Sequence, residues 1–231
     1  MPATATIDGA LEEFLAEQRE RLSAKTMRNY DDVVSLLRMS LNSYAYDSLD
    51  EPEQERWREA FDAGDEDAFT KLFGPEKIVN HFGEFLGYFM IRKVFASQEL
   101  LRASGTVTKK LAKWLFERGY ISDDDREDAV ERAGDAAHQL PRADRLGTLL
   151  HEVMERTPPF DRDQVAEEDW IEDFLTIERV EPGELWFEDG IGPVRVPKKA
   201  SDLAEAGWGV NIVLAKLRGE WRIVELGFVY P

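Results

Sequence analysis

Residues 170–187, WIEDFLTIERVEPGELWF, decide the fold of the C-terminal part of the chain. Their apolar residues alternate with polar ones, which is the period of a β-strand and not of a helix. Residues 181–184, EPGE, place proline and glycine at the two central positions of a type II turn. The stretch therefore predicts two strands, at residues 170–180 and 185–188, joined by a tight turn.

Three more strands are expected, at residues 193–196, 210–217 and 221–230. The last two flank Arg218-Gly219, which suits a hairpin turn. Residues 200–206 predict a single helical turn between the third and fourth strands. Five short strands in about 60 residues suit a small closed β-barrel, and both an OB-like and an SH3-like barrel fit this order.

Residues 7–120 predict helices throughout. After Ser23, a residue type favoured at N-caps, apolar side chains recur every three or four positions: Met27, Tyr30, Val34, Leu37, Leu41 and Tyr44. Shorter helices are expected at residues 51–63 and 65–72, separated by Gly64, and another opens at Gly74-Pro75. This last helix is apolar nearly all round over residues 85–95, which is typical of a helix inside a bundle.

Residues 121–168 carry 14 acidic and 6 basic side chains. Ser122, followed by three aspartates, predicts one helix start, and Pro141 predicts a second. We therefore expect an α+β multidomain chain. It would consist of an all-α helical bundle at residues 1–121, an acidic helical connector at 122–168 and a small five-stranded β-barrel at 169–231.

The composition excludes several classes of protein. The chain has 231 residues, no cysteine and a formal net charge of −18. Disulfides and thiolate metal sites are therefore excluded, and no apolar run approaches the ~20 residues of a membrane-spanning helix. The start of the chain lacks the basic and apolar regions of a signal peptide, so we expect a cytoplasmic protein that does not contact a membrane.

One segment of this acidic chain is basic. Residues 92–118 contain seven basic side chains and two acidic ones. On a helix, at about 100° per residue, Lys109, Lys110 and Lys113 gather on one side, opposite an apolar side. Hydroxyl residues precede them, at the expected helix start, where free backbone N–H groups suit a phosphate: Ser104, Thr106 and Thr108. This segment predicts a basic helix face suited to nucleic-acid phosphates.

Two motifs in the helical region resemble a known family. Leu22-Ser23-Ala24-Lys25-Thr26, followed by Tyr30, is similar to the opening of the N-terminal core-binding domain of tyrosine recombinases of the phage-integrase type. Residues 111–121, LAKWLFERGYI, resemble the final helix of that domain. The resemblance is confined to residues 7–121. It implies a SAM-like bundle that clamps one side of duplex DNA, with matching positions at Lys25, Thr26, Thr108, Lys109, Lys110 and Lys113.

The resemblance does not extend to catalysis. A recombinase catalytic domain needs more chain than the 110 residues that follow Ile121, most of which are expected to form the barrel. We expect no strand cleavage, and no residue pattern indicates a catalytic, metal or cofactor site. The expected function is that of a non-enzymatic DNA-associated protein, with candidate contacts at Lys25, Thr26, Arg102, Thr106, Thr108, Lys109, Lys110 and Lys113.

Four alternatives stay open, one of which is an enzyme of unrecognised type. The basic face is an ordinary solvated surface, or the acidic connector folds against it and forms salt bridges through residues 123–135. In the third alternative the chain is a protein-interaction or regulatory module that binds no nucleic acid. Its partners would then contact the aromatic residues of the barrel, among which alternation predicts an exposed Trp186: Trp170, Trp186, Phe187, Trp208 and Trp221.

Overall fold

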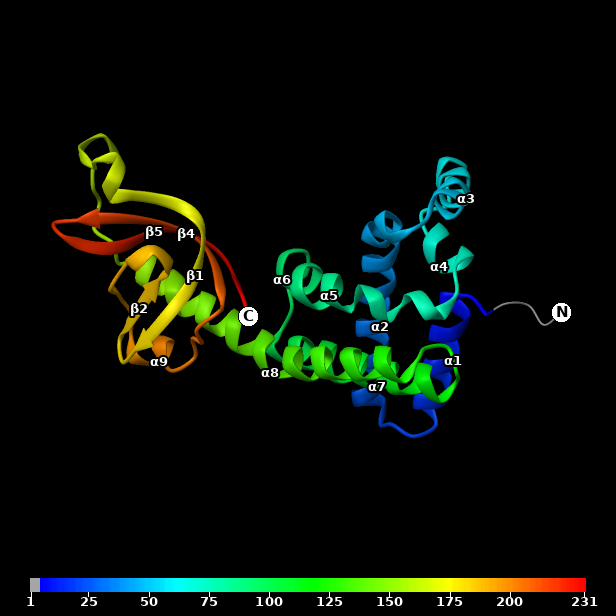
Figure 1. Cartoon of the computed structure of the whole chain (residues 1–231). Coiled ribbons are helices and arrows are strands. Elements are labelled where there is room, and N and C mark those ends of the chain that lie inside the picture. The colour runs from blue at the N-terminus through cyan, green and yellow to red at the C-terminus, as the bar shows by residue number, and fades with distance from the viewer. Residues whose placement is uncertain (1–4) are drawn as a thin grey trace. The chain divides into compact units, whose positions relative to one another are not determined.

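The computed structural model describes residues 5–231 and divides into two compact units, one ending at His138 and one beginning at Gln139. Helices make up the first unit, and a closed five-stranded barrel makes up most of the second (Figure 1). The structure therefore confirms the α+β class with a helical bundle followed by a small barrel. The division falls inside the segment expected to be a connector.

Seven helices and the first half of an eighth form the described part of the first unit. They are α1 (Ile7–Arg19), α2 (Ala24–Tyr44), α3 (Glu51–Asp62), α4 (Ala68–Leu72), α5 (Phe82–Glu84), α6 (Met90–Arg92), α7 (Gln98–Glu117) and α8 (Asp123–Met154). Ser23 caps α2 by accepting a hydrogen bond from the Thr26 backbone N–H at 3.3 Å. The core is rich in fully buried phenylalanines: Phe14, Phe69, Phe82 and Phe85.

The segment from Gly74 to Phe95 is not the single helix that the sequence predicts. It breaks into the 3-10 turns η2 (Pro75–Lys77) and η3 (Val79–His81), then α5, a π-helical turn η4 (Phe85–Phe89) and α6. The helical backbone ends at Arg92, and Phe95 lies beyond it with its side chain fully exposed. The apolar run therefore contributes to the core only as far as Met90.

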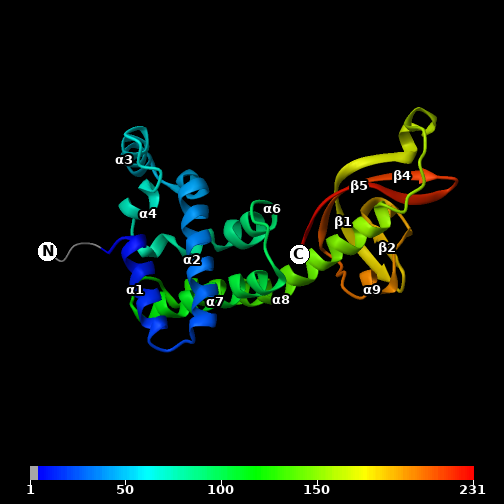
Figure 2. The same ribbon diagram turned by 180° about the vertical axis from the view of Figure 1, so that it is seen from behind.

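α7 and the first half of α8 form a helical hairpin and run side by side (Figures 1 and 2). Gly105 permits their close approach. A Cβ atom at this position would lie 2.4 Å from the backbone nitrogen of Ala137 and 2.5 Å from the backbone oxygen of Ala133. α8 begins where expected, because Ser122 and Asp125 exchange side chain–backbone hydrogen bonds at 3.2 and 3.3 Å.

α8 is one continuous helix, and the prediction of a second helix start at Pro141 is wrong. Pro141 lies inside the helix, where it removes a backbone hydrogen bond at a cost of about 3 kcal/mol. Burial on both sides of the proline offsets this cost. Ala133 is fully buried in the first unit, and Leu146 and Leu150 are fully buried in the second.

The second unit closes its strands in the order β1-β2-β3-β5-β4. The strands are β1 (Trp170–Glu181), β2 (Glu184–Phe187), β3 (Val194–Arg195), β4 (Gly209–Leu217) and β5 (Glu220–Tyr230), with the helical turn α9 (Lys198–Ser201) between β3 and β4. β3 and β5 pair in parallel, and the other pairs are antiparallel. This non-sequential order is a Greek-key arrangement, in agreement with the OB-like alternative.

Both predicted turns are present, because Gly183 has a φ of 86° and Arg218 and Gly219 both have positive φ. The second half of α8 completes the barrel core, where Leu146 and Leu150 pack with Ile177 and Phe187. Arg142 of α8 also pairs with Glu205 and donates to the Leu203 carbonyl at 2.9 Å. The second half of α8 therefore belongs to the same compact unit as the barrel.

Candidate nucleic-acid interface

One exposed stripe of α7 carries the basic side chains. Arg102, Thr106 and Lys113 are exposed, and Lys109 and Lys110 are half-buried. The opposite side of the helix is buried in the first unit: Val107, Leu111, Trp114 and Leu115. This separation of a basic from an apolar side is the one expected from the helical period.

Thr108 does not belong to the basic side, and its prediction as a phosphate contact is wrong. Its side chain is fully buried, and its hydroxyl donates to the carbonyls of Ser104 and Gly105 at 2.7 and 3.2 Å. Ser104 is buried in the same way and donates to the Leu101 carbonyl at 2.7 Å. Since α7 begins at Gln98, these residues lie inside the helix, where the helical hydrogen bonds already use the backbone N–H groups.

The basic residues of α7 have no carboxylate partner. Arg102, Lys109, Lys110 and Lys113, here called the basic stripe, make no ion pair within residues 5–231. Arg118, at the end of the same helix, pairs with two glutamates of α1. In a chain with 47 acidic side chains, four neighbouring cations without an ion pair are a candidate contact for an anion.

The helix α2 contacts α7, and the first turn of α2 carries two of the predicted DNA contacts. Lys25 and Thr26 are both exposed, and the Thr26 hydroxyl is 3.0 Å from that of Ser23. One turn further along, the Asn29 side-chain amide donates to Glu99 in the first turn of α7 at 3.3 Å. The structure thus links the two helices that carry the predicted contacts, close to Lys25 on one and to the start of the basic stripe on the other.

The acidic start of α8 does not neutralise the basic stripe through ion pairs. A Cβ atom at Gly134 of α8 would lie 3.0 Å from the Lys109 amine, so this lysine reaches over α8. No ion pair joins the stripe to residues 123–135 in the part of the chain that the structure describes. Two of the acidic residues of α8, Asp123 and Glu127, form ion pairs with Arg126 of the same helix. The salt bridges expected from masking are therefore not formed.

The four tryptophans of the second unit each carry a cation of the same chain over the ring. The distances from the cationic group to the ring centroid are 4.0 Å for Arg162 and Trp170, 4.2 Å for Arg179 and Trp186, 5.5 Å for Arg142 and Trp208, and 5.6 Å for Lys216 and Trp221. Trp186 is half-buried rather than exposed, and its indole nitrogen is buried. Trp208 is buried, and on the other three rings the cation occupies a face on which a nucleobase could stack.

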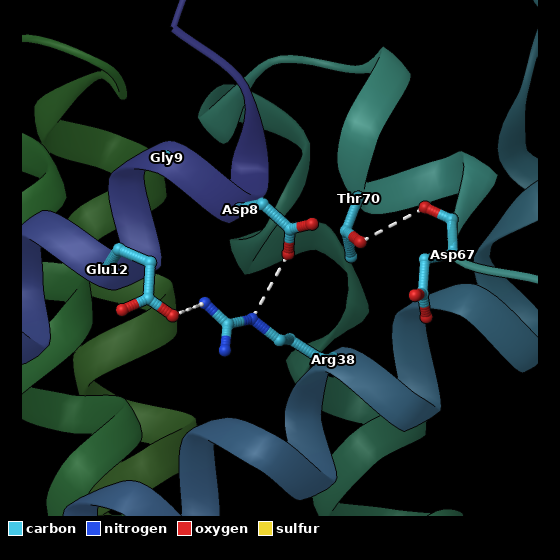
Figure 3. Close-up of a pocket in the computed structure, with 6 residues that line it drawn as sticks. All are labelled: Asp8, Gly9, Glu12, Arg38, Asp67 and Thr70. Atoms are coloured by element: carbon cyan, nitrogen blue, oxygen red, sulfur yellow. Dashed lines mark hydrogen bonds and ion pairs between the residues drawn. The ribbon is translucent and has the colours of Figure 1, made fainter.

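A pocket of about 370 Å³ lies between α1, α2 and α4 (Figure 3). Arg38 reaches across it and pairs with Asp8 at 3.1 Å and Glu12 at 2.6 Å. The Thr70 hydroxyl donates to the Asp67 backbone carbonyl at 3.2 Å. The charged groups therefore hold the helices to one another, which is a structural role.

Three further findings concern the whole described chain. Residues 5–231 contain no cluster of three or more histidine, aspartate or glutamate side chains placed to hold a metal ion. None of the helices in this range is both long and apolar enough to cross a membrane. A scan against protein-family models and searches of curated proteins and of solved structures found no match to this chain.

Proposed function

We propose that the chain is a non-enzymatic DNA-associated protein whose basic stripe binds the phosphates of duplex DNA. The observation that carries this proposal is the set of four unpaired cations on one exposed side of α7. Lys25 and Thr26 of α2 add a second point of contact. The similarity of residues 7–121 to a recombinase core-binding domain supports the same surface.

The length of the stripe suits a row of phosphates. Arg102 and Lys113 are eleven positions apart on α7, which corresponds to about 16 Å at 1.5 Å per residue. Double-stranded DNA carries one phosphate per about 1.7 Å of axis when both strands are counted, so the stripe is long enough to face several phosphates. Each of the four cations can therefore neutralise a different phosphate.

The proposed binding does not depend on base sequence. Sequence is read by side chains that hydrogen-bond to base edges, whereas lysines at a phosphate act as point charges. Thr106 is an exposed hydroxyl beside the basic stripe, and it donates to the Arg102 carbonyl of its own helix at 3.0 Å. The contacts proposed here therefore position the duplex without selecting it.

A protein-interaction or regulatory module without nucleic-acid binding is the second candidate. One observation favours it: the net charge of −18, which acts against a nucleic acid and not against a protein partner.

Fluorescence anisotropy of labelled duplex DNA, at low and at physiological salt, tests the proposal. The wild-type chain is expected to bind, more weakly as salt rises, and Lys109→Glu/Lys110→Glu/Lys113→Glu is expected not to bind. A variant of equal net charge, Lys198→Glu/Lys199→Glu/Lys216→Glu in the second unit, serves as the control and should retain binding. Equal loss in both variants, or no binding by the wild type, would refute the basic stripe as the DNA contact.

A further inference from the structure

The outer face of β1, β4 and β5 carries a groove that the proposed DNA contact does not use. The groove has a volume of about 520 Å³, and it is lined by three consecutive residues of each strand, at 172–174, 211–213 and 225–227. All of these belong to the second unit. Its lining contains three carboxylates and no basic side chain.

The register of the three strands places two carboxylates on either side of an apolar floor. Val213 of β4 is paired with Glu172 of β1 on one side and with Glu225 of β5 on the other. Ile212 and Leu214 belong to the barrel core, so Val213 points outward by alternation. Neighbouring strands are about 4.8 Å apart, so the two glutamates stand about 10 Å apart across the groove.

Phe174 forms one wall of the groove with a ring that is 47% exposed. Its ring and that of Tyr230 are in an edge-to-face arrangement, with centroids 5.5 Å apart. Unlike the tryptophans of this unit, Phe174 has no cation of the described chain over its ring. The exposed part of its ring can accept a cation from outside.

Neither glutamate nor Asp173 is neutralised within residues 5–231, because none of the three makes an ion pair there. The side-chain oxygen of Asn211, in the floor of the groove, is a buried acceptor without a donor. The carboxylates, the exposed ring and the buried acceptor of this groove therefore suit a group that donates hydrogen bonds and carries positive charge.

We propose that this groove binds a basic side chain, arginine above all, of a partner protein. The aliphatic stem of the side chain would lie over Val213. Its guanidinium group would lie between Glu172 and Glu225 and against the face of Phe174. Arginine fits better than lysine, because its planar group donates to two carboxylates and stacks on an aromatic ring at the same time. This inference is independent of the proposed DNA contact.

Binding of a fluorescein-labelled octa-arginine peptide to the full chain at physiological salt tests the proposal. Because a chain of charge −18 attracts any polycation, the control must carry the same charge. The groove variant is Glu172→Lys/Glu225→Lys, and the control is Glu167→Lys/Glu168→Lys, at two exposed acids of the same unit. We expect at least a tenfold weaker affinity in the groove variant and less than a twofold change in the control.

Equal weakening in both variants, or no binding by the wild type, would overturn the proposal. Phe174→Ala provides a test that leaves the charge unchanged, and it should weaken the affinity severalfold. NMR shift mapping of the wild type with N-acetylarginine amide gives a readout that needs no variant. Shifts confined to residues 172–174, 211–213 and 225–227 would support the groove, and shifts spread over the acidic surface would refute it.

Discussion

The salt dependence of the proposed DNA binding measures how many phosphates the basic stripe neutralises. Each phosphate neutralised by a lysine or arginine releases counterions, so the logarithm of the binding constant falls with the logarithm of salt with a slope of about −0.9 per contact. Arg102, Lys109, Lys110 and Lys113 together predict a slope of about −3.6. Between 50 and 200 mM salt, the affinity should then fall by roughly 10²-fold.

Removal of one contact should change the slope by a fixed amount. In Lys113→Ala we expect a slope of about −2.7, because one counterion-releasing contact is lost. Lys113 is exposed and unpaired, and alanine favours a helix, so the stability of the fold should change by no more than about 0.5 kcal/mol. Lys25→Ala tests the first turn of α2. A wild-type slope near −4.5 that falls to about −3.6 in this variant would add it as a fifth contact.

The measurement belongs above about 50 mM salt, since at lower salt the Debye length grows beyond ~14 Å and repulsion between the net charge of −18 and the duplex reaches further. Circular dichroism should show unchanged helix content in each variant. A slope that is unchanged in Lys113→Ala would refute the counting argument. A wild-type slope near zero would refute phosphate binding altogether.

Three further predictions concern the folded structure. Gly105→Ala should destabilise the chain by about 1–3 kcal/mol in urea unfolding, because the new Cβ meets the α8 backbone, whereas Gly87→Ala, with open space around it, should not. Leu150→Ala should cost about 2–5 kcal/mol and lower the thermal midpoint of the barrel, while Thr148→Ala, on the exposed side of α8, should leave it unchanged. Burial lowers the pKa of His81, so its folded state binds fewer protons than the unfolded chain below the usual pKa of about 6.5. The contribution of neutral, buried His81 to the free energy of unfolding is therefore complete above about pH 6.5 and is lost as the pH falls through the folded pKa. Between about pH 7.5 and pH 5, the wild type should lose more stability than His81→Gln.

Much of the architecture could be predicted from local pattern. The change of period at Trp170, the turn at Pro182-Gly183 and the hairpin at Arg218-Gly219 all correspond to observed elements. The same holds for the basic and apolar sides of α7. These features depend on side chains a few positions apart, and short-range geometry is therefore sufficient to predict them.

Tertiary packing decided the remainder. Thr108 lies between Val107 and Lys109 in sequence, but its side of α7 is buried. Its hydroxyl, which was expected to contact a phosphate, therefore donates a hydrogen bond within its own helix. Pro141 is a helix-start signal that the two cores override, because burial on both sides of it outweighs one lost hydrogen bond.

The sequence by itself determined two things: the order of a helical part followed by five strands, and the positive charge of residues 92–118. The tertiary structure alone decided which of those charges lack a carboxylate partner, and that Glu172, Val213 and Glu225 meet across three strands. The physical reason is the distance in sequence over which each feature acts. Helix and strand periods are local, whereas ion pairing and strand register join residues that the sequence places far apart.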